Sequence, residues 1–80
     1  MIIVLFRTIH GDAYNITESN LESIVIQIYN SPDEETSYRA VVNLNSDSIC
    51  FAVFETLDHC EEYVNQLTYN INKHLFNKSI

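Results

Sequence analysis

Hydrophobic and polar residues alternate in short runs over the part of the chain up to residue 54. Residues 2–8 (IIVLFRT) are rich in β-branched and aromatic residues and contain no breaker, which predicts a strand, and a shorter strand is expected near 13–16. Between them, His10-Gly11-Asp12 predicts a turn, because glycine takes positive φ at little cost. A short turn between consecutive strands indicates an antiparallel hairpin.

Residues 17–29 are compatible with two structures. The spacing of apolar residues between 21 and 28 fits a helix that Thr17 would cap. The stretch IVIQIY is nevertheless almost entirely β-branched or aromatic, and Ile24, Ile26 and Ile28 alternate. We favour a strand over 23–29, with a connection at 17–22.

Two further strands are expected after this one. Residues 31–36 (SPDEET) predict a loop that begins at its proline. Residues 38–44 (YRAVVNL) alternate in hydrophobicity, 45–47 predict a tight turn, and 49–54 (ICFAVF) are apolar throughout. The short turns predict an antiparallel meander.

The stretch FETLDHCEE (residues 54–62) predicts the start of a helix. Thr56 is a good N-cap, and the carboxylates that follow it favour the positive end of a helix dipole. Behind the cap, apolar residues recur at steps of three and four: Leu57, Cys60, Val64, Leu67, Ile71 and Leu75.

These elements predict an α+β fold. The expected architecture is one small domain, residues 1–80, with an antiparallel meander sheet of four to five strands and one C-terminal helix packed on one face. Hydrophobic residues make up 46% of the 80-residue chain, with one Gly and one Pro, so a packed core is expected rather than disorder.

The adjacent His59 and Cys60 do not predict a catalytic or metal site. Neighbours in a helix point about 100° apart, and Cys60 lies on the apolar stripe, where we expect a buried, unreactive thiol. No metal-binding, phosphate-binding or hydrolase motif occurs in the sequence. We therefore expect no cofactor, no metal, no catalytic residue and no enzyme activity. Two cysteines are too few for a disulfide framework, which favours a reduced, cytoplasmic protein.

The formal net charge of −7 disfavours direct binding of nucleic acid or of anionic membranes. It favours a basic protein partner, although solubility alone also accounts for such a charge. The candidate partner-binding carboxylates form two clusters: Asp33, Glu34 and Glu35, and Asp58, Glu61 and Glu62.

Two features predict a homodimer. Strands 2–8 and 49–54 carry apolar residues on both faces, and a single helix covers only one face of a sheet. On the helix, Tyr69 and Phe76 lie opposite the apolar stripe and form an aromatic seam, unless the helix frays there. We expect the uncovered sheet face to form the contact first, and the seam second.

The segments GDAYNITESNLESIVIQI and YRAVVNLNSDSICFAVFETLDHCEEYVNQL resemble small uncharacterised proteins of Firmicutes and their phages. The residues that carry the resemblance are Gly11, Asp12, Asn15, Phe54, Thr56, Tyr63 and Leu67. The resemblance covers most of the chain and implies a strand at 23–29. It transfers no catalytic residue, and Cys60 stands where such proteins usually have Ala.

Two hypotheses for the function follow. The first is a non-enzymatic, acidic, self-associating protein-interaction module, in its sharper form a phage or mobile-element inhibitor of a basic, nucleic-acid-handling host protein. The alternative is a small-ligand-binding module with an aromatic pocket between sheet and helix. A flat acidic face favours the first, and a concave pocket with buried polar groups favours the second.

Overall fold

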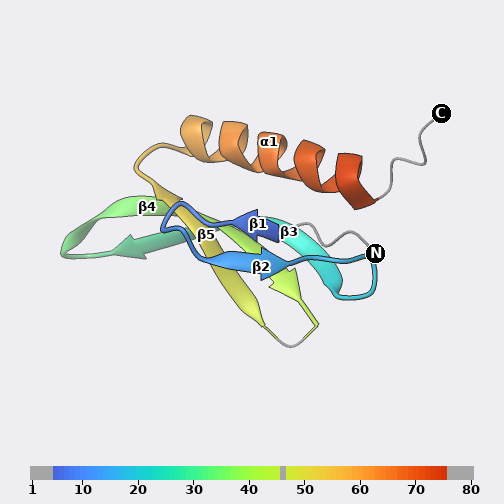
Figure 1. The fold of residues 1–80 in the computed structure, drawn as a ribbon. Coiled ribbons are helices and arrows are strands. Elements are labelled where there is room, and N and C mark those ends of the chain that lie inside the picture. The colour runs from blue at the N-terminus through green and yellow to red at the C-terminus, as the bar shows by residue number, and fades with distance from the viewer. Residues whose placement is uncertain (1–4, 46, 76–80) are drawn as a thin grey trace.

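The computed structural model describes residues 5–45 and 47–75. Over these residues the chain forms five strands followed by one helix (Figure 1), which confirms the predicted α+β class with a C-terminal helix. The elements are β1 (Leu5–Arg7), β2 (Ala13–Asn15), β3 (Leu21–Ser31), β4 (Glu34–Leu44), β5 (Ser48–Phe54) and α1 (Leu57–Leu75).

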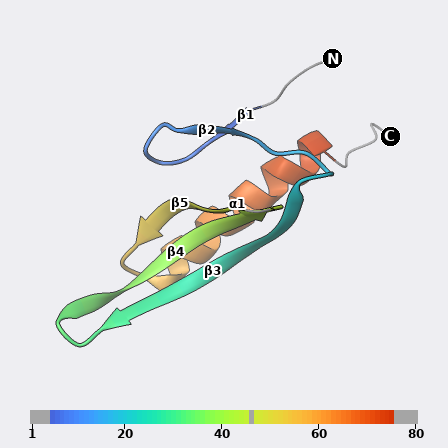
Figure 2. The same ribbon diagram turned by 90° about the horizontal axis from the view of Figure 1, so that it is seen from below.

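The strands form two antiparallel sheets rather than one continuous meander. One sheet pairs β1 with β2, and the other has the order β3-β4-β5 with β4 in the centre. The helix packs along one face of β3–β5, and the hairpin β1–β2 lies beside the β5 edge, where the Ile9 amide donates to the Phe51 carbonyl at 2.8 Å (Figures 1 and 2). Seen from below in Figure 2, no described element covers the other face of β3–β5.

The core lies between the sheet, the helix and the hairpin. One cluster joins all three parts, because Phe6 and Ile16 from the hairpin region pack with Val42 and Phe51 of the sheet and with Leu67 and Ile71 of α1. A second, smaller cluster under the first turns of the helix contains Ala40, Ala52 and Cys60. Small residues there allow the helix to approach the sheet closely.

A β-bulge in β5 changes which of its residues are buried. The register between β4 and β5 shifts at the step from Ala40 to Val41, which leaves Phe51 as an extra residue on β5. Both Phe51 and Ala52 are therefore fully buried, although they are neighbours in the sequence. Val53 remains 46% exposed.

The uncovered face of β3–β5 is less apolar than the sequence led us to expect. Across one end, Asn43 donates to the Ser23 hydroxyl at 3.0 Å and accepts from the Ser48 hydroxyl at 2.7 Å. Farther along, the Arg39 guanidinium lies 4.8 Å from the ring centroid of Tyr29. The twisted central strand buries Val41 itself to 3% exposure, even without a cover from the helix.

Most local predictions are confirmed. Gly11 takes a φ of 94° in the first turn, and the region 23–29 is a strand rather than a helix. The Thr56 hydroxyl accepts a hydrogen bond from the His59 amide at 3.3 Å, as an N-cap should. The predicted strand 2–8 is confirmed over 5–7, and its first residues lie outside the described ones.

The predicted loop at 31–36 is wrong. Ser31 pairs with Glu34, so the turn is only Pro32-Asp33, and β4 begins at Glu34. The polar residues there have weak strand propensity, but long pairing with β3 and a hydrogen bond from Thr36 to Asn30 (3.1 Å) extend the hairpin.

Candidate functional site

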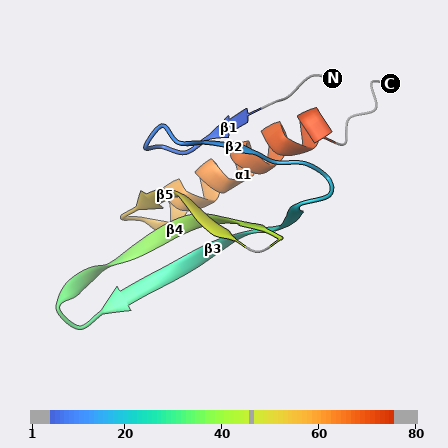
Figure 3. The same cartoon turned by 60° about the horizontal axis from the view of Figure 1, so that its bottom comes forward.

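The hairpin β3–β4 reaches beyond the start of the helix and ends in a cluster of acids. The molecule is 48 Å long and 26 by 21 Å across, and Figures 2 and 3 show the hairpin tip extending past the sheet and helix. Asp33, Glu34 and Glu35 occupy the tip, and all three are exposed. The predicted first acidic cluster therefore lies at the most protruding point of the fold.

The second predicted cluster lies on the first turns of α1. Asp58, Glu61 and Glu62 are exposed there, and Glu55 lies in the two-residue connection from β5. Figures 1 and 3 place the start of α1 and the hairpin tip at the same end of the molecule. We call this region the acidic end. It contains seven of the eleven acidic residues: Asp33, Glu34, Glu35, Glu55, Asp58, Glu61 and Glu62.

The histidine and cysteine at the start of the helix face different surroundings. His59 is exposed, whereas Cys60 is fully buried against Ala40 and Ala52. Burial raises the pKa of the Cys60 thiol above its ordinary value, and the neighbouring Cys50 and Glu61 raise it further. The buried position predicted for Cys60 is confirmed, and its lack of reactivity stays a prediction.

The described residues contain no group of three or more His, Cys, Asp or Glu side chains arranged to hold a metal ion. Over the same residues, the structure has no helix with the length and apolar character needed to cross a bilayer.

The predicted aromatic seam is only half described. Tyr69 is 64% exposed on the helix, away from the buried stripe. Phe76 lies outside the described residues.

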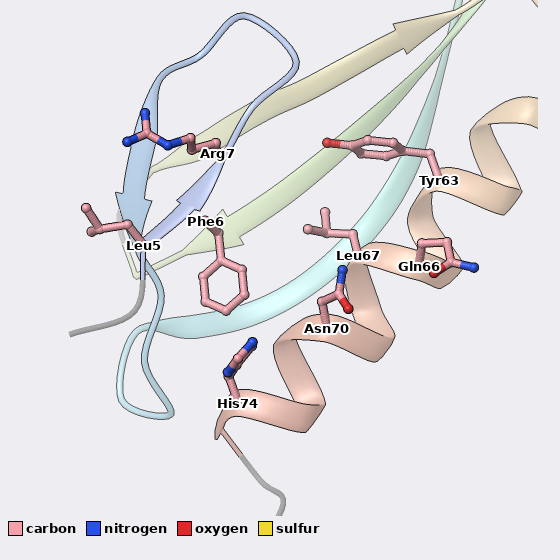
Figure 4. Close-up of a pocket in the computed structure, with 8 residues that line it drawn as sticks. All are labelled: Leu5, Phe6, Arg7, Tyr63, Gln66, Leu67, Asn70 and His74. Atoms are coloured by element: carbon pink, nitrogen blue, oxygen red, sulfur yellow. The ribbon is translucent and has the colours of Figure 1, made fainter. Parts of the chain in front are cut away.

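A groove runs between β1 and α1. It has a volume of about 520 Å3, and Figure 4 shows its walls. One wall is β1 (Leu5–Arg7), and the other is a face of α1 formed by Tyr63, Gln66, Leu67, Asn70 and His74. The sequence hypothesis placed an aromatic pocket between sheet and helix. The groove lies between β1 and α1, whereas core side chains pack the space between α1 and β3–β5. The signal that sequence analysis overlooked is a row of polar residues at helical spacing beside the buried stripe of α1: Gln66, Asn70 and His74.

Different parts of β1 and α1 contribute to the groove. In Figure 4, Phe6 points toward His74, and Tyr63 points from the helix toward the hairpin, whereas the side chains of Leu5 and Arg7 point away from the helix. The rings of Phe6 and His74 meet edge to face, with centroids 6.0 Å apart. Leu5 and Arg7 therefore border the groove mainly through their main chain and the base of their side chains.

The chemistry of the groove differs from that of the acidic end. None of its lining residues is a carboxylate, and two of them, Arg7 and His74, are basic residue types. Among the described residues, the Arg7 guanidinium donates one hydrogen bond, to the Gly11 carbonyl at 3.1 Å, and its other N–H groups can bind a ligand. Burial, followed by the nearby Cys50, raises the pKa of the Tyr63 phenol, so Tyr63 stays a neutral hydrogen-bond donor.

No known family, curated protein or solved structure matches this chain. The resemblance to small Firmicutes and phage proteins therefore rests on the sequence segments alone.

Proposed function

We propose that the protein is a non-enzymatic interaction module that binds a basic protein through its acidic end. The observation that carries the proposal is the gathering of seven carboxylates at one end of a chain with a net charge of −7. A field of one sign on a protruding surface speeds the encounter with an oppositely charged partner.

The shape of the acidic end supports this proposal. Of the tip carboxylates, Asp33 lies in a two-residue turn and Glu34 and Glu35 lie at the start of β4, so all three are held on a defined hairpin rather than on a long loop. Those of α1 stand on the first turns of a capped helix. Both groups are exposed and can reach a partner without any rearrangement of the core.

In its sharper form, the partner is a nucleic-acid-handling protein, and the module is an inhibitor made by a phage or other mobile element. Exposed carboxylates would then occupy the basic surface that otherwise receives phosphates. The two cysteines, Cys50 and Cys60, are both unpaired, which supports activity in the reducing cytoplasm.

The test is a comparison of two triple variants with equal net charge. The tagged protein and its Asp33→Ser, Glu34→Ser, Glu35→Ser variant are used to capture proteins from a Firmicutes lysate at low and moderate salt. We expect the native protein to retain a basic partner whose affinity falls as salt rises, because surface charges are screened beyond about 10 Å at 0.1 M. The tip variant should bind this partner more slowly.

The control variant changes three exposed acids outside the acidic end: Asp12→Ser, Glu22→Ser and Asp47→Ser. It should bind as the native protein does, because it keeps the acidic end. Equal losses in both triple variants would show that only net charge matters. Failure to capture any basic protein at low salt would contradict the proposal.

Self-association is a second part of the proposal. The uncovered face of β3–β5 supports it, because Tyr29 and Val53 remain 48% and 46% exposed there. Light scattering over a concentration series distinguishes a 9.3 kDa monomer from a dimer. If a dimer forms, its loss in Val53→Thr implicates the sheet face, and its loss in Tyr69→Ser implicates the helix.

A small-ligand-binding module is the alternative, and the groove between β1 and α1 is the observation that favours it. Its volume is within the range of about 300–1,000 Å3 that small-molecule sites occupy. A protein-detected NMR screen with compact aromatic compounds tests it. Binding that shifts signals of Phe6, Tyr63 and His74 would support this function, and no binding would remove it.

A further inference from the structure

The first strand has an edge without a partner strand among the described elements. The order of its sheet is β1-β2, so pairing occupies only one side of β1. The groove is lined by β1 and by α1 but by no residue of β2. Figures 1 and 4 both show β1 between β2 and the helix, so its other edge borders the groove.

The register of the hairpin determines which main-chain groups point into the groove. The Thr8 amide donates to the Asp12 carbonyl at 2.8 Å, and Phe6 pairs with Tyr14 two residues further along the same ladder. Hydrogen-bonded and non-bonded pairs alternate in antiparallel strands, so Phe6 bonds to Tyr14. The N–H and C=O groups of Leu5 and Arg7 therefore point away from β2, toward the groove.

We propose that this groove binds an extended peptide segment of another protein, which adds to β1 as a third strand. Addition of a strand to a free sheet edge beside a helix is a recurrent mode of peptide recognition. It would satisfy the main-chain groups of Leu5 and Arg7. The site is distinct from the acidic end and does not depend on what binds there.

The dimensions suit this occupant. From Tyr63 to His74 the helix wall is about 16 Å long, at about 1.5 Å per residue. A segment of about five residues has the same length when it is extended. An added strand would pair with the main chain of β1 on one wall and contact the side chains of α1 on the other. A compact ligand would leave the main-chain groups of Leu5 and Arg7 without partners.

The side chains around the groove define the chemistry of the segment. A residue paired with Phe6 would point toward Leu67 and the Phe6–His74 pair, which favours an apolar or aromatic side chain. Residues paired with Leu5 and Arg7 would point to the opposite face, where a carboxylate can reach the guanidinium. The segment therefore alternates apolar and acidic residues.

The lining of the groove is complementary in charge to an acidic segment, although the chain as a whole is acidic. The lining of the groove contains Arg7 and His74 and no carboxylate. Most of the negative charge lies at the acidic end, and at about 0.15 M salt its field is screened beyond about 8 Å. Binding is therefore measured at that ionic strength.

The probe is an array of blocked hexapeptides in which Val, Ile or Tyr alternates with Glu. We expect at least one to bind the native protein, and its version with Lys in place of Glu to bind about tenfold more weakly. On binding, exchange of the Leu5 and Arg7 amide protons should slow. Exchange of the Phe6 amide should change little, since it already bonds to Tyr14.

Two matched pairs separate strand addition from other binding. Leu5→Pro removes one groove-facing N–H and should raise the Kd about tenfold, whereas Leu5→Ala keeps the N–H and should change the Kd by less than about twofold. In the peptide, N-methylation of one alternate set of amides should abolish binding, and methylation of the other set should be tolerated. The peptide pair carries the test if Leu5→Pro does not fold.

Three results would overturn the proposal. One is that no peptide of the array binds at millimolar concentration. Another is binding that survives Leu5→Pro and methylation of either set of peptide amides, while exchange of the Leu5 and Arg7 amide protons does not slow. That result would mean that the peptide binds without pairing with β1. The third is protection of these two amides from exchange in the free protein that rises with protein concentration, which would mean that a second copy of the chain pairs with this edge of β1.

Discussion

Two parts of the hairpin β3–β4 are built from the same kinds of residue and have different surroundings. Near its base, Ile24 and Val42 face α1 and contribute to the main core cluster. Near its tip, Ile28 is 64% exposed and Tyr29 is 48% exposed, although both pair regularly with β4. Strand pairing and side-chain contacts between the two strands, such as Arg39 over Tyr29, therefore hold the distal part of the hairpin, whereas the proximal part also has a hydrophobic cover.

The position of the helix causes this difference. The last residue of β5, Phe54, pairs with Tyr38, and only two residues connect it to α1. The helix thus begins at the level of Tyr38 and runs back along the sheet. The hairpin beyond Tyr38 projects without cover, and it carries the tip of the acidic end. The other end of the helix borders the groove.

The largest expected effect comes from making the same substitution in the covered core and in the distal hairpin. Ile71→Ala, on the face of α1 that covers the proximal hairpin, should lower the free energy of unfolding by about 2–5 kcal/mol, through lost burial and a residual cavity. Ile28→Ala should change it by less than about 0.5 kcal/mol. Urea unfolding of both variants measures the difference. A large, concentration-dependent loss in Ile28→Ala would instead mean that a second copy covers the distal hairpin.

The sequence predicts the strands well because their signals are local. Alternation at 38–44 and β-branched residues at 23–29 favour strands, and both stretches are strands in the structure. Thr56 defines the start of the helix within one residue. The hairpin tip was predicted wrongly, because Glu34 and Glu35 have weak strand propensity and only their pairing with β3 makes them a strand.

The groove and the division into two sheets depend on contacts between distant residues. The bulge at Phe51 buries two successive residues of β5, and no feature of ICFAVF distinguishes it from a regular strand. The groove depends on where β1 lies along α1, which follows from the packing of Phe6 and Ile16 with the helix. The acidic residues themselves were identified from composition, but their gathering at one end follows from the tertiary fold.

A smaller effect is expected at Thr56, which caps the helix at the level where the covered part of the hairpin ends. Thr56→Ala removes the acceptor of the His59 amide and should lower the free energy of unfolding by about 1 kcal/mol. Thr56→Ser keeps the hydroxyl and should retain most of the stability. Equal losses in both variants would mean that the methyl group, and not the cap, is responsible.

At alkaline pH the protein should lose stability through Cys60, which is buried under the helix in the covered part. Because burial raises the pKa of this thiol in the folded state, the unfolded chain loses its proton first as the pH rises. The stability is thus fully present below the unfolded thiol value of about 8.5 and decreases as the pH rises above it. Urea unfolding at several pH values measures the slope, which should become shallower in Cys60→Ala and in Cys60→Ser. An unchanged slope in both variants would contradict this assignment.

The smallest effect on stability is expected at the acidic tip. The variant Asp33→Ser, Glu34→Ser, Glu35→Ser removes exposed side chains that pack on no core residue, so at moderate salt its free energy of unfolding should stay within about 0.5 kcal/mol of the native value. At low salt it should become slightly more stable relative to the native protein, because three like charges at the hairpin tip repel each other and the repulsion is screened as salt is added. Urea midpoints at low and high salt measure both effects, and Asp12→Ser, Glu22→Ser, Asp47→Ser controls for net charge. A marked loss of stability in the tip variant alone would mean that these carboxylates are needed to fold the hairpin, and the acidic tip would then have a structural role that requires no binding partner.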